Sequence, residues 1–191
     1  MGTEYFNIID SVIAKLRNRK VRRYILENDV LLDFGCGYQG YFLLDLRNQI
    51  KEGIGIDYDA ENDKLGNIKF LKYKYVQSLP FENGYFSKVT MLAVIEHFSE
   101  DALSKLFKEV SRILKKDGKI ILTTPTPFGK TILEFLAFKL HLISKEEISD
   151  HKKYYTKEDI NVIAKNCGFV PELYDKFQFG INSISILRKA H

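Results

Sequence analysis

The chain has 191 residues, of which 45% are hydrophobic and 28% are charged, and its formal net charge is +4 at pH 7. This length and ordinary composition exclude a fibrous or largely disordered chain and suit one globular domain with one core. The two cysteines, Cys36 and Cys167, are too few for a disulfide framework, so we expect a reducing, cytoplasmic location. The basic cluster within residues 17–23 is interpreted as the solvated face of a helix, and no nucleic-acid partner is expected.

The first segment, residues 1–28, is predicted to be a helical lead-in to the domain. Ile9, Val12 and Leu16 recur at helical spacing. Charged residues interrupt this apolar run, so we expect no signal peptide. The longest apolar segment, 131–143, also contains charges and is shorter than the roughly 20 residues that span a bilayer, so no transmembrane helix is expected.

The pattern that follows is typical of one βαβ unit. Residues 30–34 form a short apolar run, as in a strand buried on both faces of a parallel sheet. A glycine-rich turn and an expected helix over 41–48 come next. A second short strand over 53–56 then stops at Asp57.

The remaining segments continue the alternation of strands and helices. We expect strands over 68–73, 87–92 and 119–123, helices that begin at Ser99 and at Thr156, and two final strands over 169–174 and 183–187. This order predicts a mostly parallel sheet that ends in a hairpin.

The segment from Asp33 to Gly40 joins the first strand to the first helix. Glycines at positions 35 and 37 permit a tight turn and a close approach of the backbone to a ligand. Asp57 lies 20 residues after Gly37, at the end of the next strand, where a carboxylate can accept hydrogen bonds from both hydroxyls of a ribose. These features predict an adenosine-containing cofactor, and the alternative is a simple turn with a surface aspartate.

Asp33 favours S-adenosylmethionine over a nicotinamide dinucleotide. A dinucleotide places its pyrophosphate on the N-terminus of the helix, where a carboxylate two residues before Gly35 would repel it. S-adenosylmethionine instead presents a cationic amino group and a sulfonium, which a carboxylate can hold.

Five ordered motifs resemble those of the class I S-adenosylmethionine-dependent methyltransferases, in their small-molecule branch. They are residues 32–37, 55–57, 79–81, 94–97 and 117–119. The resemblance implies an α/β fold with a Rossmann-like, doubly wound sheet of seven strands, mostly parallel with an antiparallel last strand and with helices on both faces. It also implies S-adenosylmethionine as cofactor, S-adenosylhomocysteine as its product, and a site at the C-terminal edges of the strands.

Carried over residue by residue, the resemblance divides the cofactor contacts into two groups. Contacts to the methionine moiety fall on Asp33, Gly35, Cys36, Gly37, Leu92 and Ala93, and contacts to the adenosine fall on Asp57, Tyr58, Val76, Gln77 and Ser78. Two positions depart from the family pattern. Tyr75 stands where an aspartate commonly contacts the adenine amine, and Ser87 replaces an aspartate of the fourth strand, a change we interpret as structural.

His97 and His151 are the candidate general bases for a hydroxyl or acidic-carbon acceptor, because an imidazole titrates near neutral pH. The alternatives are a structural hydrogen bond near the cofactor for His97 and an exposed loop position for His151. The sequence contains no convincing cluster of metal ligands, so no metal is expected.

Residues 125–149 are predicted to be a helical insertion that caps the substrate pocket. Core packing, a dimer face and peripheral membrane contact through residues 131–143 are the alternatives. The expected function is methyl transfer to an O, N or C atom of a small molecule, with a sugar or a lipid-linked metabolite as candidate acceptor. A nicotinamide-dependent oxidoreductase and a non-catalytic module that binds the cofactor remain alternatives, and the chain fits a monomer or a homodimer.

Overall fold

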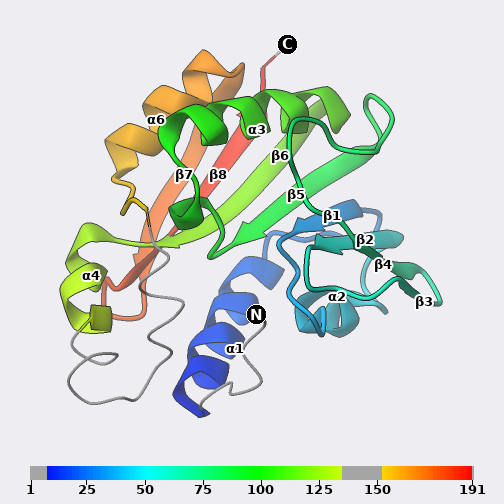
Figure 1. Cartoon of the computed structure of the whole chain (residues 1–191), viewed down its shortest axis with the longest axis horizontal. Helices are drawn as coiled ribbons and strands as arrows, with labels where there is room; N and C mark the ends of the chain where they lie inside the picture. Colours follow the sequence, from blue (N-terminus) through cyan, green and yellow to red (C-terminus); the bar gives the residue numbers. More distant parts are fainter. Residues whose placement is uncertain (1–7, 135–151, 191) are drawn as a thin grey trace.

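A sheet of eight strands forms the centre of the molecule, and helices cover both of its faces (Figure 1). The computed structural model describes residues 8–134 and 152–190. In chain order the strands are β1 (Val30–Phe34), β2 (Glu52–Asp57), β3 (Asp63–Leu65), β4 (Ile68–Lys72), β5 (Phe86–Leu92), β6 (Leu114–Pro125), β7 (Phe169–Phe177) and β8 (Asn182–Lys189). The predicted doubly wound α/β fold is confirmed.

The strands follow the order β3-β4-β2-β1-β5-β6-β8-β7. The five strands from β4 to β6 in this order pair in parallel, whereas β8 pairs antiparallel with both β6 and β7. The antiparallel last strand and the final hairpin are therefore confirmed. The sheet has one strand more than the predicted seven, because β3 pairs antiparallel with β4 at the sheet edge. All three residues of β3 are exposed, so no alternation of apolar and polar residues marked it in the sequence.

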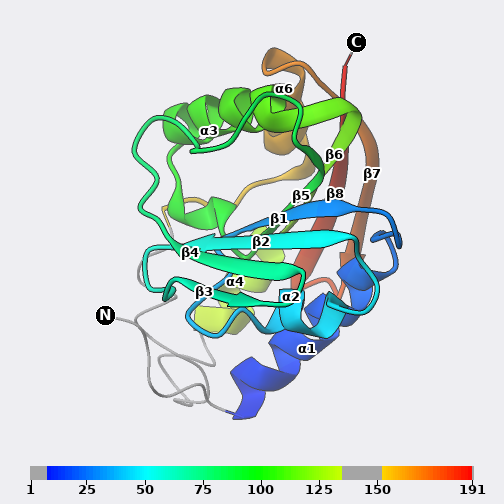
Figure 2. The same cartoon turned by 90° about the vertical axis from the view of Figure 1, so that its right-hand side faces the viewer.

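The helices are divided between the two faces of the sheet (Figure 2). One face carries α1 (Ile8–Arg22) and α2 (Tyr41–Leu46), and the other carries α3 (Glu100–Ile113) and α6 (Lys157–Asn166). Two further helices follow strands: η1 (Ile95–His97) after β5 and α4 (Pro127–Glu134) after β6.

Each face of the sheet has its own apolar core. The core beneath α3 and α6 includes Leu32, Val89, Leu103, Phe107, Val110, Ile160 and Phe169, and the core beneath α1 and α2 includes Val21, Leu31, Phe42, Leu46, Ile121 and Ile184. A fully buried aliphatic or aromatic side chain contributes about 1.5–3 kcal/mol, so these two layers supply most of the stabilisation. The inner face of α3 is buried, with Leu103, Phe107 and Val110 on it.

Side-chain caps fix the beginnings of α3 and α6 as the sequence predicted. The Ser99 hydroxyl accepts a hydrogen bond from the Ala102 amide at 3.4 Å. The Thr156 hydroxyl accepts from the Asp159 amide, and the Asp159 carboxylate accepts in return from the Thr156 amide at 2.8 Å. This reciprocal pair is a capping box, which satisfies two amides that a helix start leaves without partners.

A buried ion pair lies at the N-terminal ends of β1 and β5. The Lys88 ammonium donates to the Asp29 carboxylate at 2.5 Å, and both side chains are nearly buried. The Ser87 hydroxyl donates to the other Asp29 oxygen at 2.8 Å and accepts from the Val30 amide at 3.0 Å. The structural interpretation of Ser87 is therefore supported by its contacts between β1 and β5.

The predicted insertion at residues 125–149 is described only in its first part, where α4 forms. Residues 135–149 lie outside the described residues. In the part of the chain that the structure describes, no helix is both long and apolar enough to cross a membrane.

Candidate active site

The C-terminal ends of β1, β2 and β5 meet at one edge of the sheet. β1 lies between the other two strands, with Asp33 paired with Gly55 of β2 and with Thr90 of β5. The glycine-rich turn after β1, Asp57 at the end of β2 and Ala93 after β5 therefore lie side by side. Ligands of open α/β sheets bind at this edge.

The glycine turn depends on its missing side chains. The Gly35 and Cys36 amides both donate to the Ile56 carbonyl, at 2.9 and 3.3 Å, and hold the turn against β2. Gly35 has a φ of +77°, and a Cβ there would lie 2.5 Å from a Val94 methyl. Gly37 has a φ of +70°, and the position of its Cβ is open space. Position 35 therefore requires glycine, because a larger residue would clash with Val94, whereas Gly37 leaves room for a ligand.

Asp57 is fixed by two backbone amides at the end of β2. One carboxylate oxygen accepts from the Gly37 amide at 2.9 Å, and the other accepts from the Asp59 amide at 2.9 Å. A carboxylate oxygen can accept more than one hydrogen bond, so both oxygens retain capacity for a ligand. The next residue, Tyr58, is 55% exposed. The hydrogen bond from the Gly37 amide links the glycine turn directly to Asp57.

Asp33 is buried behind the glycine turn. The Thr90 hydroxyl donates to its carboxylate at 2.6 Å. Burial raises the pKa of Asp33 to about 7, because the charged form loses its hydration. Burial and the nearby carboxylates also raise the pKa of the Cys36 thiol, so this thiol stays protonated and is not a nucleophile.

The loop between β4 and β5 carries the residues predicted to border the adenine. Val76 is 74% exposed, and Gln77 and Ser78 are also exposed. Tyr73 donates to the Ser78 carbonyl at 2.5 Å and Tyr75 donates to the Gln77 carbonyl at 3.4 Å. The tyrosines therefore support the backbone that carries these three residues.

The Tyr75 ring packs into an aromatic cluster. Its centroid lies 5.8 Å from that of Phe34 in an edge-to-face arrangement and 6.5 Å from that of Phe98. Partial burial raises the pKa of its hydroxyl. The side chain at this position is thus a neutral packing group.

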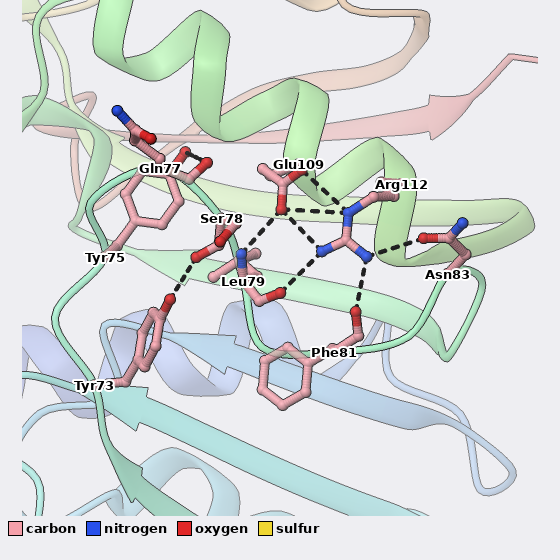
Figure 3. A network of polar contacts seen from close by, with 9 residues as sticks. All are labelled: Tyr73, Tyr75, Gln77, Ser78, Leu79, Phe81, Asn83, Glu109 and Arg112. Carbon is pink, nitrogen blue, oxygen red and sulfur yellow. Dashed lines mark hydrogen bonds and ion pairs between the residues drawn. The ribbon is translucent and has the colours of Figure 1, made fainter.

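Two residues of α3 hold the far end of the same loop, and the sequence did not reveal them. Figure 3 shows the Arg112 guanidinium pointing from α3 to the loop, where it donates to the Leu79 carbonyl at 2.9 Å and the Phe81 carbonyl at 2.7 Å. Glu109 accepts from the Leu79 amide at 2.9 Å and pairs with Arg112 at 2.9 Å. This Glu109–Arg112 pair satisfies both the amide and the carbonyl of Leu79.

The end of β5 carries Leu92 and Ala93, which are both partly exposed. Ala93 has a φ of +58°, a left-handed conformation that is uncommon for a residue with a side chain. Its amide donates to the Thr123 carbonyl at 3.0 Å, so the bend is fixed to β6. Such strain is characteristic of functional sites.

η1 follows this bend and contains one of the two candidate bases. His97 is half-buried there, and its neighbour Glu96 is fully buried with Thr124 donating to its carboxylate at 3.1 Å. Burial raises the pKa of Glu96. The Glu96 carbonyl accepts from the Lys152 amide at 2.8 Å, so the segment after residue 151 lies against η1.

The second candidate base, His151, lies outside the described residues. Its sequence neighbours are held near the site by contacts to α3 and α6: Lys153 pairs with Glu100 and with Asp159. Among the described residues, no group of three or more acidic, histidine or cysteine side chains is arranged to hold a metal ion.

These features define an α/β domain with a glycine turn and a strand-end aspartate at its ligand-binding edge. Residues 5–173 match the methyltransferase domain family, which covers most of the chain. The chain therefore belongs to the class I S-adenosylmethionine-dependent methyltransferases, and S-adenosylmethionine is the cofactor of that family. Family membership removes the support for a nicotinamide-dependent oxidoreductase.

Individual proteins match part of the chain. The chain is 33% identical over 133 residues to uncharacterized protein MJ1252 of Methanocaldococcus jannaschii, a match that covers 63% of this chain and 50% of that protein. It is 30% identical over 105 residues to sterol 4-C-methyltransferase strm-1 of Caenorhabditis elegans, covering 50% of this chain and 30% of that protein. The chain thus matches half or less of the length of these relatives.

The fold is also shared with solved methyltransferases. CalO1, a methyltransferase in calicheamicin biosynthesis solved with S-adenosylhomocysteine bound, superposes with a TM-score of 0.71 at 13% identity. The superposition covers 95% of this chain and 55% of that chain.

Proposed function

We propose that this domain transfers the methyl group of S-adenosylmethionine to an O, N or C atom of a small-molecule acceptor. The observation that carries the proposal is the hydrogen bond between the Gly37 amide and the Asp57 carboxylate at 2.9 Å. It joins the turn that would hold the methionine moiety to the acid that would hold the ribose, with open space above Gly37.

The residues at this edge fit the charges and shape of S-adenosylmethionine. Asp57 would accept hydrogen bonds from the ribose hydroxyls, and the exposed ring of Tyr58 would pack on the adenine. Gly35, Cys36 and Gly37 would contact the methionine moiety through their backbone. The remaining proposed contacts are Asp33 with the cationic amino group, Leu92 and Ala93 beside the methionine moiety, and Val76, Gln77 and Ser78 along the adenine edge.

S-adenosylmethionine supplies a methyl group already activated on a sulfonium. The protein then has to align the acceptor, exclude water and, for a hydroxyl or acidic carbon, accept a proton. We assign the proton acceptor to His97 because it is half-buried in η1, the short helix that follows β5 and the strained Ala93. His151 remains a second candidate, since the backbone that follows it is hydrogen-bonded to η1.

Residues 125–149 are proposed to cap the acceptor, within one domain that spans residues 1–191. β6 ends at Pro125 at the edge that carries the site, and α4 begins two residues later. The names of the two methyltransferases compared above, one for sterols and one in calicheamicin biosynthesis, support a small-molecule acceptor. Cys36 and Cys167 are free thiols, which supports the proposed cytoplasmic location.

The test is S-adenosylhomocysteine release from S-adenosylmethionine in the presence of sugars, phenols and lipid-linked acceptors. We expect turnover with one of these classes, and we expect His97→Ala to lower kcat by about 100-fold or more without weakening cofactor binding. Asp45→Ala, on the exposed end of α2, is the matched control and should retain full activity. Cofactor binding without turnover on any acceptor would instead support the non-catalytic module.

A further inference from the structure

We infer that the outward side of α1, the turn at residues 178–181 and the start of α4 form one surface that docks onto an anionic lipid bilayer. We call it the α1 face. Its exposed apolar residues are Val12, Leu16, Phe128 and Phe179, and its exposed cations are Lys15, Arg19, Arg22 and Arg23. The inference is independent of methyl transfer, because it uses none of the residues assigned to the cofactor.

The three segments of the α1 face are joined by direct contacts. The Gln178 side-chain amide donates to the Ile13 carbonyl of α1 at 2.9 Å. On the other side of the turn, the Thr126 hydroxyl donates to the Gly180 carbonyl at 2.7 Å, and the Cβ position of Gly180 lies 3.8 Å from the Phe128 ring. Both views place α1 and α4 toward the same lower end of the molecule (Figure 1; Figure 2).

The turn presents a large aromatic side chain to solvent at the cost of backbone strain. Phe179 is fully exposed with a φ of +57°, and Gln178 before it has a φ of +52°. The conformation is fixed because Asn182 donates to the Gln178 side chain at 2.6 Å. A single exposed apolar residue is ordinary, but a partner that buries this exposed aromatic ring would gain apolar contact.

The cations of α1 lie on the same side of the helix as its exposed apolar residues. Val12, Lys15, Leu16, Arg19 and Arg23 follow the spacing of three or four residues that aligns side chains along one face. Two cations of α1 form ion pairs, Lys20 with Asp175 and Arg22 with Asp45. Lys15, Arg19 and Arg23 have no acidic partner among the residues that the structure describes.

This mixture favours a lipid surface over a nucleic acid. Basic side chains attract anionic headgroups, and aliphatic and aromatic side chains enter the boundary between headgroups and acyl chains. A nucleic acid would pair with the cations but would leave Val12 and Leu16 exposed. Because β7 is parallel to β1, its C-terminal turn lies at the edge that carries the candidate site, so docking would bring that edge to the membrane.

The experiment is co-sedimentation of the full chain with vesicles of phosphatidylcholine alone and of phosphatidylcholine mixed with phosphatidylglycerol. We expect binding only to the anionic vesicles, with binding reduced by added salt. The double variant Arg19→Gln/Arg23→Gln should lower the partition coefficient about 25-fold, because each basic residue contributes about fivefold at a membrane surface. Phe179→Ser should also weaken binding. It should do so at every salt concentration, because it removes apolar contact.

The matched control is Lys115→Gln/Lys116→Gln, which removes the same charge from exposed positions at the start of β6, at the opposite edge of the sheet. This variant should bind vesicles like the unmodified chain. Equal loss in the control, no binding to anionic vesicles, or tighter binding to a single-stranded RNA of matched charge would each overturn the inference. Unchanged affinity for S-adenosylhomocysteine in all variants would show that neither folding nor the cofactor site is affected.

Discussion

Removal of the Arg112 side chain should both destabilise the domain and weaken its affinity for S-adenosylmethionine. The guanidinium donates to two loop carbonyls, those of Leu79 and Phe81, and pairs with Glu109. Hydrogen bonds from a charged group contribute about 1.5–3 kcal/mol when buried. The Arg112 side chain is 32% exposed, so water replaces part of each bond. We therefore expect Arg112→Ala to lower the free energy of unfolding by about 2–3 kcal/mol.

The loop connects this stability effect to the cofactor. Arg112 fixes the loop just after Val76, Gln77 and Ser78, so its loss should raise the KM for S-adenosylmethionine more than it lowers kcat. The hydrogen bond from Arg112 holds the pKa of Glu109 below its ordinary value. The contribution of the Glu109–Arg112 pair to stability should therefore disappear in acid, as the Glu109 carboxylate takes up a proton.

Urea unfolding followed by circular dichroism measures the first effect, and initial rates measure the second. Lys105→Ala is the control on the same helix, because its pair with Asp101 is largely exposed and contributes less than about 0.5 kcal/mol. Arg112→Lys should be intermediate, since an ammonium lacks the planar fork that reaches two carbonyls. The reasoning is refuted when Arg112→Ala costs no more stability than the control.

Three further predictions concern other parts of the domain. Gly35→Ala should destabilise the fold by about 1–3 kcal/mol and abolish cofactor binding, because its Cβ would lie 2.5 Å from a Val94 methyl at a positive φ; native affinity in a titration would contradict this. Since the pKa of Asp33 is raised from 3.8 to about 7, the folded state binds the extra proton. Stability should then fall between about pH 4 and about pH 7, and Asp33→Asn should flatten that part of the urea-midpoint profile. Lys88→Ala should cost about 3–5 kcal/mol in urea unfolding by leaving Asp29 buried and unpaired, and a cost below about 1 kcal/mol would show that the site admits water.

The central part of the fold could be predicted from the sequence because its signals are local. The run from Val30 to Phe34 is apolar at four of its five positions and is buried throughout, as a central parallel strand requires. Gly35 and Asp57 were recognised by their places after β1 and at the end of β2. The registers of β1 and β2 then bring them together, with Phe34 paired with Ile56.

The unpredicted features depend on contacts between distant residues. β3 has no buried face, so only its pairing with β4 defines it. The Glu109–Arg112 pair sits on a helix whose apolar spacing was clear, but its partners are backbone atoms of a loop about 30 residues earlier. The order of side-chain types in a sequence does not predict a hydrogen bond from a side chain to a distant backbone carbonyl.

Tyr75 shows how structure changes the meaning of a departure from a family pattern. The sequence presented it as the loss of an acid near the adenine. In the structure its ring packs against Phe34 and Phe98, so the position supports the loop. Adenine recognition is then expected to rest on the backbone of residues 76–78 and on Tyr58.

The most direct test of the proposed cofactor site is isothermal titration of the chain with S-adenosylhomocysteine and with NAD, repeated with Asp57→Ala. We predict binding of S-adenosylhomocysteine alone, weakened about 10- to 100-fold by the substitution because one or two charged hydrogen bonds to the ribose are lost. Asp45→Ala should leave the affinity unchanged. Binding of NAD, or binding of S-adenosylhomocysteine that Asp57→Ala does not weaken, would contradict the account of the site.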